Sequence, residues 1–356
     1  MDVRRRAAHL VLVRGHSIAG AARECGLSRP TVRLWVARAR VRGFGALGEE
    51  SRRPRSFRSA TPADVEQEIV SAKARFPAWG AKKLWTHLWK GEAPVCVRTV
   101  DRILDRHGLT RSSLAKELPR RFERESPNAL WQMDFKGLGI PRMPYSPLSV
   151  LDDASRFCIA FEPVAWPHTA EGVWAVLWSL LGEFGQPEAV LTDNEGCFAS
   201  PKGNGPSLLE SRLWRLGIRT LQGRPAHPQT QGKVERFHRT AQEELGELLR
   251  QPTVDAARQV YEGFVSTYNW VRPHEALDMR VPGELYRPST RARPQRLPEP
   301  VVLGKARKVD ASGKFWFGGH PHRAGRGLMN QWVDVRDDGL AYYAGIALGS
   351  LDELRV

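Results

Sequence analysis

The stretch Leu130-Trp131-Gln132-Met133-Asp134-Phe135 decides the fold, because here the chain changes from helical spacing to a strand pattern. Two further strands are expected over Leu148–Leu151 and Phe157–Phe161. The polar residues Asp152–Ser155 between them are typical of a hairpin turn. These segments together predict the antiparallel beginning of a sheet.

Beyond this point the pattern alternates between helix and strand. Three antiparallel strands followed by such an alternation are the order expected of a ribonuclease H-like sheet. The sequence therefore predicts a central α/β core over residues 125–287, closed by further helices. The expected elements are a helix over Ala170–Phe184, a strand over Ala189–Thr192, a helix near Leu208–Leu216, a strand over Ile218–Leu221 and a helix over Gly232–Leu249.

The N-terminal residues 1–45 predict a helix-turn-helix. Short helices are expected over His9–Val13 and Ile18–Glu24, and a third helix begins after the N-cap Ser28. One face of the third helix is apolar, and the other is either an ordinary solvated surface or a recognition surface for the DNA major groove. The residues that would contact DNA are Arg29, Thr31, Arg33 and Arg38.

A basic linker and a second helix-turn-helix follow. Residues 46–62 are rich in Gly, Arg, Ser and Pro without periodicity, as in a linker that could lie along phosphates. Residues 63–115 repeat the helical theme, and the arginines of the last helix are either DNA contacts or ordinary surface residues. The helices are expected over Val65–Phe76, Ala81–Trp89 and Val97–His107. The DNA-contact candidates in these two segments are Arg52, Arg53, Arg98 and Arg102.

The C-terminal part predicts a small β domain. A Pro- and Arg-rich linker covers residues 288–300, and short strand-like runs with turn residues fill residues 301–356. The last domain is expected to resemble a small β-barrel. The fold class is therefore multidomain, with all-α helix-turn-helix units, a central α/β ribonuclease H-like core and a small all-β domain.

The charge distribution indicates a polyanionic partner. The 356 residues include 54 Lys and Arg against 39 Asp and Glu, a net charge of +15. Residues 1–60 hold 14 Arg against 4 acids, a net of +10, whereas residues 125–250 hold 12 basic against 15 acidic residues, a net of −3. Basic flanks favour nucleic acid, and an acidic middle favours a divalent metal.

The cysteines and the N-terminus indicate a soluble cytoplasmic protein. The 4 cysteines lie far apart, with neither a C-x-x-C pair nor the spacing of a secreted disulfide framework. The apolar run after the basic N-terminus is too short for a signal peptide or a membrane span.

Three carboxylates stand where a metal site would need them. Asp134 lies within the first strand, Asp193 at the end of a later strand and Glu235 near the start of a helix. Two or three converging carboxylates can hold a pair of Mg²⁺ ions about 3.5–4 Å apart, and such a pair catalyses phosphoryl transfer. Each acid also has a structural alternative: Asp193 could cap a turn with Asn194, and Glu235 could be a solvated helix residue. A strand Asp flanked by apolar residues is uncommon in a core, which favours function for Asp134.

Other polar residues in the core are interpreted as structural. Asp152 and Asp153 belong to the hairpin turn rather than to a metal site. His227, His238 and His274 do not have metal-ligand spacing and are expected to be structural or to face DNA.

At these acids the sequence resembles a known family. The stretches that carry the likeness are Trp131–Phe135, Leu151–Phe157, Thr192–Asn194, Pro228–His238 and Tyr268–Leu277. They are similar to those of bacterial insertion-sequence transposases of the DDE, retroviral-integrase-like group. The two helix-turn-helix units and the linker Ser51–Pro54 resemble the N-terminal half of those proteins, so the likeness covers nearly the whole chain.

The resemblance implies a function. It implies that Asp134, Asp193 and Glu235 are the catalytic and metal-binding triad for two Mg²⁺ or Mn²⁺ ions. It also implies that Lys233 and Arg236 contact the DNA ends. The implied reaction is cleavage at the 3′ ends of a transposon, followed by their transfer to target DNA. A dimer or tetramer on DNA and a bacterial, nucleoid-associated location are implied with it.

Four features depart from the family pattern. Between Asp193 and Glu235 lie 41 residues, where about 35 are usual. Glu195 replaces the usual Gly, and it either crowds the metal site or adds a carboxylate. Cys96 replaces the Ser cap of the second recognition helix. The absence of a His-His-Cys-Cys zinc module excludes a retroviral integrase proper.

Two other functions remain open from the sequence. A transposase-derived repressor would bind DNA with a core that no longer holds metal. A metal-dependent nuclease would cleave without joining, and no sequence feature separates cleavage from transfer because both use one site.

Overall fold

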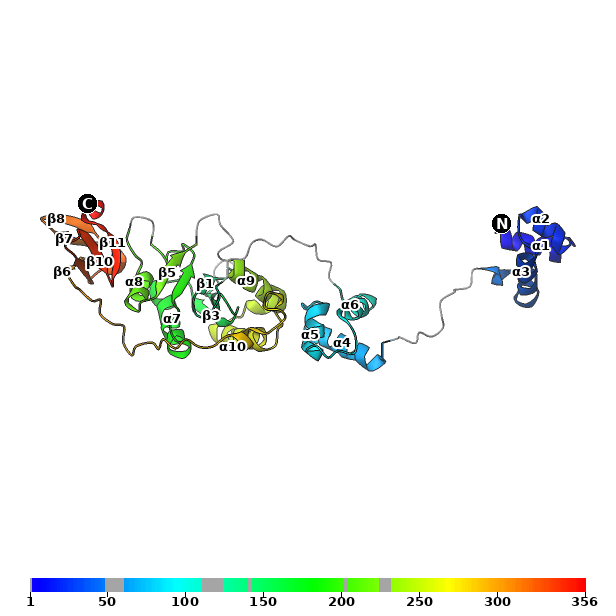
Figure 1. Ribbon diagram of the computed structural model, residues 1–356, viewed down its shortest axis with the longest axis horizontal. Coiled ribbons are helices and arrows are strands. Elements are labelled where there is room, and N and C mark those ends of the chain that lie inside the picture. Colours follow the sequence, from blue (N-terminus) through cyan, green and yellow to red (C-terminus); the bar gives the residue numbers. More distant parts are fainter. Residues whose placement is uncertain (1, 49–60, 111–123, 140–142, 201–203, 224–231) are drawn as a thin grey trace. The chain divides into compact units, whose positions relative to one another are not determined.

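The computed structural model describes residues 2–48, 61–110, 124–139, 143–200, 204–223 and 232–356. The chain divides into two compact units, Met1–Thr61 and Pro62–Val356. Their elements are labelled in Figure 1. Within the described ranges, every helix is too short or too polar to span a lipid bilayer.

The first unit is a three-helix bundle that ends in a 3₁₀ turn. The first helix begins at Val3 rather than at His9, because the Asp2 carboxylate caps it and accepts a hydrogen bond from the backbone N–H of Arg4 at 3.2 Å. The Ser28 hydroxyl caps the third helix as expected, accepting from the N–H of Thr31. The elements are α1 Val3–Leu12, α2 Ile18–Cys25, α3 Arg29–Arg42 and η1 Phe44–Leu47.

The second unit begins with another three-helix group. Its members are α4 Ala63–Arg75, α5 Ala81–Trp89 and α6 Val97–Arg106. Their apolar faces share a core that includes Ile69, Leu84, Val100 and Ile103. Cys96 precedes α6 at the N-cap position and its side chain makes no capping hydrogen bond, as expected of a residue that replaces Ser.

A five-stranded mixed sheet forms the centre of the second unit. Its order is β3-β2-β1-β4-β5, in which β1 pairs antiparallel with β2 and parallel with β4. The ribonuclease H-like order expected from the sequence is therefore confirmed. The strands are β1 Trp131–Phe135, β2 Tyr145–Asp152, β3 Cys158–Ala165, β4 Ala189–Thr192 and β5 Arg219–Gln222.

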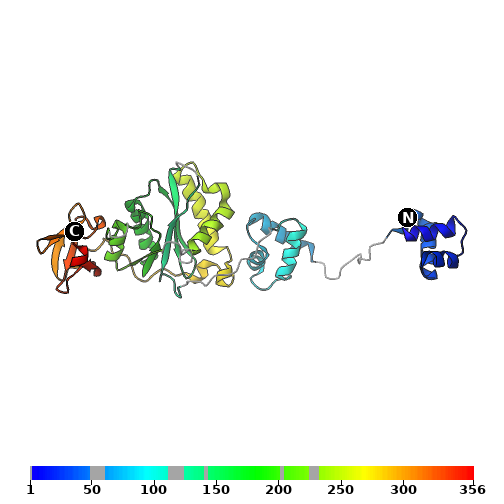
Figure 2. The same cartoon turned by 90° about the horizontal axis from the view of Figure 1, so that it is seen from above.

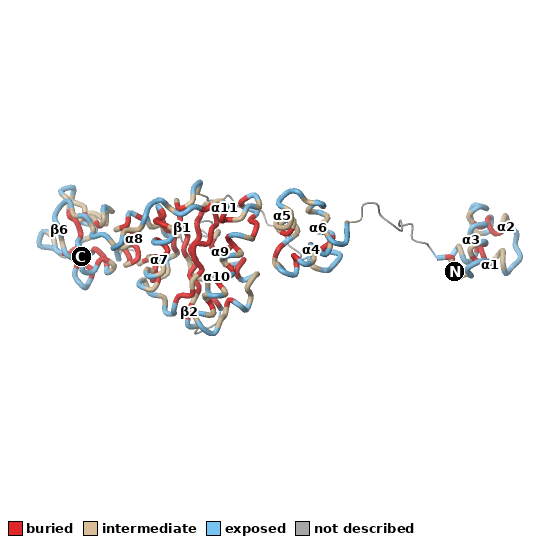
Figure 3. Tube along the Cα trace, turned by 90° about the horizontal axis from the view of Figure 1, so that it is seen from below, coloured by how far each residue is buried: buried red, intermediate tan, exposed pale blue. Residues whose placement is uncertain are grey.

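Helices cover both faces of this sheet (Figure 2). On one face, α7 (Ala170–Phe184) and α8 (Leu208–Arg215) pack on Trp131, Met133 and Leu148. On the other, α9 (Gly232–Leu245) and α10 (Val254–Trp270) pack on Tyr145 and Phe161. Figure 3 shows the buried residues running along the strands and the helix faces turned toward them.

The helix expected over Gly232–Leu249 changes form near its end. α9 stops at Leu245, and residues Gly246–Leu249 continue as the 3₁₀ helix η2. Gly246 has a φ of 54°, in the left-handed region that interrupts a right-handed helix. Two short elements follow α10, η3 Glu275–Leu277 and α11 Pro282–Leu285.

The C-terminal part is a small antiparallel β domain. A four-stranded sheet of order β11-β10-β9-β6 and a β7-β8 hairpin enclose a core around Phe315, Val333 and Tyr343. Gly205 and Gly325 let this domain approach the loop before α8, because a Cβ on either glycine would clash with the opposing backbone. Its elements are β6 Lys305–Lys308, β7 Lys314–Phe317, β8 His320–Arg323, η4 Arg326–Leu328, β9 Trp332–Val335, β10 Leu340–Tyr343, β11 Ile346–Ser350 and α12 Leu351–Leu354.

Candidate active site

The strand β1 places Asp134 on the face of the sheet that α9 covers. Successive side chains of a strand point to opposite faces. Trp131 and Met133 are fully buried against α7 and α8, so Gln132 and Asp134 point the other way. The Asp134 side chain is 19% exposed, which leaves its carboxylate in a partly buried position at the edge of a core.

The parallel pairing of β1 with β4 brings Asp193 beside Asp134. Trp131 is paired with Val190 and Gln132 with Leu191, and β4 ends at Thr192. If the same register is continued by two residues, Asp134 comes level with Asp193. Asp134, within β1, and Asp193, just after β4, therefore lie side by side at this edge of the sheet.

The first turn of α9 supplies Glu235. Val234 and Phe237 are fully buried, whereas Glu235 is exposed. Its charge acts on Asp134 together with that of Asp193. The structure therefore places the three carboxylates that the sequence singled out, from segments far apart in the chain, near enough for the charges of Asp193 and Glu235 to act on Asp134.

Partial burial and neighbouring negative charges change the pKa values of Asp134 and Asp193. Burial and, after it, the negative charges of Asp193, Glu195 and Glu235 together raise the pKa of Asp134 to about 7. Burial also raises the pKa of Asp193, although the hydrogen bond from the backbone N–H of Glu195 opposes this shift, and the charge of Glu195 adds to it. Carboxylates that repel one another in this way are neutralised most effectively by a multivalent cation.

The donor set fits a hard divalent metal. Mg²⁺ and Mn²⁺ prefer carboxylate oxygens together with water. Asp134, Asp193 and Glu235 supply only carboxylate oxygens, and the exposed position of Glu235 leaves access for water and for a polyanionic substrate. A carboxyl group whose pKa is raised as far as that of Asp134 is also typical of functional sites.

His238 belongs to this site, although the sequence analysis placed it only as structural or DNA-facing. It lies one turn after Glu235 on α9, and its Nε2 is 2.7 Å from the Ser149 hydroxyl of β2. Its Nδ1 is 3.8 Å from Asp134 Oδ2. Burial, with a contribution from Lys136, lowers the pKa of His238 to about 3, so the neutral ring makes no ion pair with Asp134. Its i+3 spacing from Glu235 was the signal for this position.

His168 was missed altogether, and it explains the orientation of Glu195. The His168 Nδ1 is 2.8 Å from Glu195 Oε1, and its ring stacks on Phe135 with the centroids 3.6 Å apart. The backbone N–H of Glu195 donates to Asp193 Oδ1 at 2.9 Å. Glu195 is therefore an additional carboxylate beside the cluster, and His168 holds it.

Asp152 stabilises the hairpin turn, as the sequence analysis predicted, whereas the Asp153 carboxylate bonds to other segments of the core. Asp152 accepts hydrogen bonds from the backbone N–H groups of Asn128 and Ser155 and from the Ser155 hydroxyl. Asp153 is fully buried and pairs with Lys233, whose Nζ is 2.6 Å from Asp153 Oδ1. Lys233 thus has a partner within the protein, and the DNA contact expected of it stays a prediction.

The remaining DNA-contact candidates differ in their exposure to solvent. Thr31 is half-buried and its hydroxyl is 2.6 Å from that of Ser28, while Arg38 is half-buried on the same helix. Arg52 and Arg53 lie outside the described residues. The candidates with exposed side chains are Arg29 and Arg33 on α3, Arg98 and Arg102 on α6, and Arg236 on α9.

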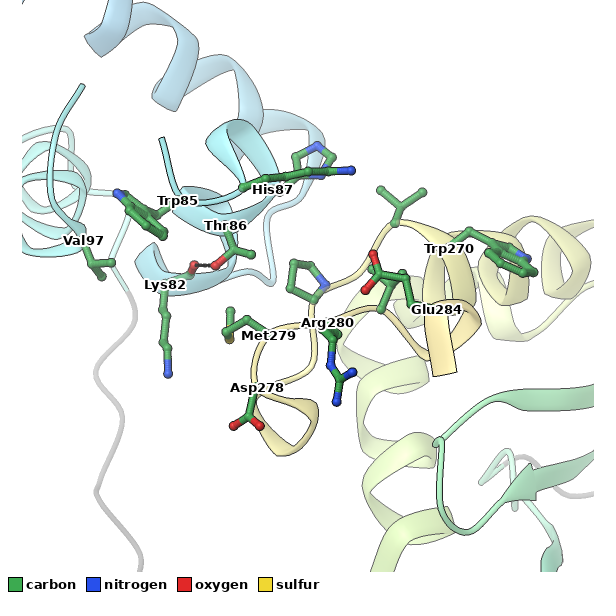
Figure 4. A pocket seen from close by; sticks show the side chains of 15 residues that line it. Lys82, Trp85, Thr86, His87, Val97, Trp270, Asp278, Met279, Arg280 and Glu284 are labelled. Atoms are coloured by element: carbon green, nitrogen blue, oxygen red, sulfur yellow. Dashed lines mark hydrogen bonds between the residues drawn. The ribbon is translucent and has the colours of Figure 1, made fainter. Parts of the chain in front are cut away.

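The second unit also contains a pocket of about 680 Å³ (Figure 4). It is bordered by α5 and by the segment from Trp270 to Glu284, and its lining includes Lys82, Trp85 and Arg280. None of the three clustered acids lines it.

The comparison with known families places the carboxylate cluster in a recognised domain. Residues 124–228 and residues 216–282 each match the integrase core domain. The first segment contains Asp134 and Asp193, and the second contains Glu235. Residues 124–282 are therefore similar to the integrase core domain. This domain includes the sheet β1–β5 and helices α7–α10, and homeodomain-like domains match residues 1–47 and 31–104 before it.

A retroviral protein is similar to part of this chain. The Gag-Pro-Pol polyprotein of Squirrel monkey retrovirus is 33% identical over 132 residues, which is 35% of this chain. The match covers 6% of the polyprotein, so the chain spans only a small part of the length of this curated relative.

Solved structures of retroviral integrases are also similar to this chain. The simian T-cell lymphotropic virus intasome in complex with PP2A regulatory subunit B56 gamma is 19% identical, covering 78% of this chain and 98% of that chain with a TM-score of 0.38. The HTLV-2 integrase catalytic core domain in complex with magnesium is 18% identical, covering 46% and 99% with a TM-score of 0.34. The catalytic core domain of BIV integrase is 25% identical, covering 45% and 93% with a TM-score of 0.34.

Proposed function

We propose that this protein is a DNA transposase of the bacterial insertion-sequence, DDE group. It would bind the repeats at the transposon ends, cleave at their 3′ ends and join them to target DNA. The observation that carries the proposal is the convergence of Asp134, Asp193 and Glu235 within an integrase core domain. The magnesium named with the HTLV-2 integrase core supports the choice of metal.

The chemistry follows from the carboxylate cluster. Asp134, Asp193 and Glu235 would hold two Mg²⁺ or Mn²⁺ ions, which lower the pKa of the attacking water or 3′-hydroxyl and stabilise the leaving oxygen when bound. His238 stays neutral and, anchored by Ser149, forms one wall beside Asp134. A protein nucleophile is not required, because the attacking oxygen comes from water or from DNA.

DNA binding would come mainly from the flanking basic segments. The net charge of +10 over residues 1–60 attracts phosphates, and the exposed arginines of α3 suit a helix that lies in the major groove. Arg98 and Arg102 on α6 and Arg236 beside Glu235 would add contacts nearer the core. Joining two ends requires that they be paired, so a dimer or tetramer on DNA in the bacterial cytoplasm is part of the proposal.

Replacing Arg33 by Ala should weaken the binding of end repeats. A side chain that contacts a base edge contributes about 1–3 kcal/mol, which corresponds to about 5- to 150-fold in affinity. Binding is measured by gel shift with an end-repeat duplex and with a scrambled duplex. Arg14→Ala is the matched control, because it removes an exposed arginine outside α3. An unchanged preference for the repeat would contradict the assignment of α3 as the recognition helix.

The direct test of the function is a cleavage and joining assay. Purified protein, Mg²⁺ or Mn²⁺ and a labelled duplex that carries the repeats flanking its gene are incubated, and the products are resolved on a denaturing gel. We expect cleavage at the repeat end and longer joined products from the wild type, and neither from Glu235→Gln. Cleavage without joining would indicate a nuclease. Binding without cleavage, with both ends present, would indicate a repressor.

A further inference from the structure

Three potential metal ligands of different chemistry meet beside the carboxylate cluster. They are His168, in the loop before α7, and Glu195 and Cys197, in the segment after β4. One ligand atom of each residue lies within 4.8 Å of the others. The set combines an imidazole, a carboxylate and a thiol, whereas the proposed catalytic triad has carboxylates alone.

Burial and packing hold this trio in place. The His168 side chain is 5% exposed, stacks on Phe135 and approaches Glu195 through its Nδ1. Cys197 is 6% exposed. The rigid surroundings would therefore present all three ligand atoms without a large loss of side-chain entropy.

A second observation points to a ligand. The Nε2 of His168 is buried and has no hydrogen-bond partner among the described residues. Buried polar atoms of native proteins nearly always have a partner, so an orphaned imidazole nitrogen calls for an explanation. Coordination of a metal by this nitrogen gives one, because the metal would be its missing partner while Nδ1 stays hydrogen-bonded to Glu195.

The ligand chemistry selects the class of metal. Thiolate and imidazole ligands suit Zn²⁺ and related transition metals, whereas Mg²⁺ requires oxygen. Three protein ligands leave one tetrahedral position for water. Binding would release the thiol proton of Cys197 to solvent.

We propose that His168, Glu195 and Cys197 form a second metal site, specific for a zinc-type cation and separate from the carboxylate triad. Its role would be to fix the segment that carries Asp193, since the backbone N–H of Glu195 holds Asp193 Oδ1. A metal on Glu195 would also keep this extra carboxylate turned toward His168 and away from the metal ions of the triad.

Titration of the metal-stripped full-length protein with Co²⁺ tests the site. Thiolate-bound Co²⁺ gives a charge-transfer absorption that a carboxylate-only site does not give. We expect this band to saturate at one equivalent in the wild type and to disappear when Zn²⁺ is added. In Cys197→Ser the band should be absent and the affinity for Zn²⁺ more than about 100-fold weaker, because loss of even an outer-shell partner costs about 10- to 100-fold.

Two controls separate this site from other cysteines and from the triad. Cys96→Ser should keep the band, since Cys96 is exposed and belongs to α6. Asp134→Asn should also keep it, so the zinc-type site and the proposed catalytic function can fail independently. His168→Gln provides a second ligand variant if Cys197→Ser does not fold. A wild type without the band, or a ligand variant that folds and keeps it at unchanged affinity, would overturn the proposal.

Discussion

The substitution Asp134→Asn should reduce metal-dependent cleavage of end-repeat DNA by more than about 100-fold. Loss of residues that merely orient metal ligands already costs about 10- to 100-fold in metal affinity or activity. Asp134 lies at the centre of the cluster, where the charges of Asp193, Glu195 and Glu235 all act on it. Its replacement by an uncharged side chain of the same shape removes a ligand with little change in packing.

The same variant should keep its affinity for DNA. The helices α1–α3 form a compact unit of their own within residues 1–61, and Asp134 is not part of it. Single-turnover cleavage and gel-shift binding should therefore be measured on the same preparation. Glu162→Gln is a matched control, because Glu162 is a half-exposed acid on β3 that forms its ion pair with Arg258. Cleavage by Asp134→Asn at the wild-type rate would refute the proposed triad.

The metal-free Asp134→Asn protein should be more stable than the wild type at pH 8. The pKa of Asp134 is 3.8 for the unperturbed group and about 7 in the folded protein, mainly because of burial. Such a difference corresponds to at most about 4 kcal/mol, and partial access to solvent reduces the expected gain to about 1–3 kcal/mol. Asn avoids the cost of holding a charge among other carboxylates.

The stability gained by Asp134→Asn should depend on pH, because Asp134 destabilises the folded wild type only when it is ionised. Above pH 7 the carboxyl group is ionised in both states, and the folded wild type carries the full penalty. The penalty diminishes as the pH falls through 7, and it vanishes below about 4, where the group is protonated in both states. Urea unfolding at pH 8 and pH 4.5 should therefore show the gain mainly at pH 8.

Added Mg²⁺ gives an independent check on the same variant. A ligand that binds only the folded state stabilises it, so Mg²⁺ should raise the stability of the wild type more than that of Asp134→Asn. Asp337→Asn is the control, because Asp337 is fully on the surface of the C-terminal domain. In the urea experiment, an equal gain in the stability of Asp134→Asn over the wild type at pH 8 and at pH 4.5 would show that repulsion within the cluster does not destabilise the fold.

The local sequence pattern predicted the bounds of several helices and strands correctly. The helix Ala170–Phe184 and the strand Ala189–Thr192 have the bounds expected from the sequence. The strand expected from Leu148 begins earlier, at Tyr145. Pro147 made the residues before Leu148 look unlike a strand, since proline has no backbone N–H to donate to the hydrogen bonds of a sheet. It is tolerated because the pairing of β2 with β1 starts only at Leu148.

The long helix α10 is an element that the sequence analysis did not locate. The sequence analysis expected closing helices but did not locate Val254–Trp270. Its buried residues Ala257, Tyr261, Phe264 and Tyr268 have the spacing of one helix face. This signal was present in the sequence and would have located the helix.

The sequence by itself predicted the class of the fold, the succession of strands and helices along the core and the three acids of the proposed triad. These follow from periodicity, turn residues and short motifs, which act over a few neighbouring residues. Only the tertiary structure decided which side chains share the site. The pairing of β1 with β4 aligns Asp134 with Asp193, and packing across the sheet brings in His238 and His168. Such contacts join residues far apart in the chain, and no local pattern specifies them because they depend on how strands align and helices pack.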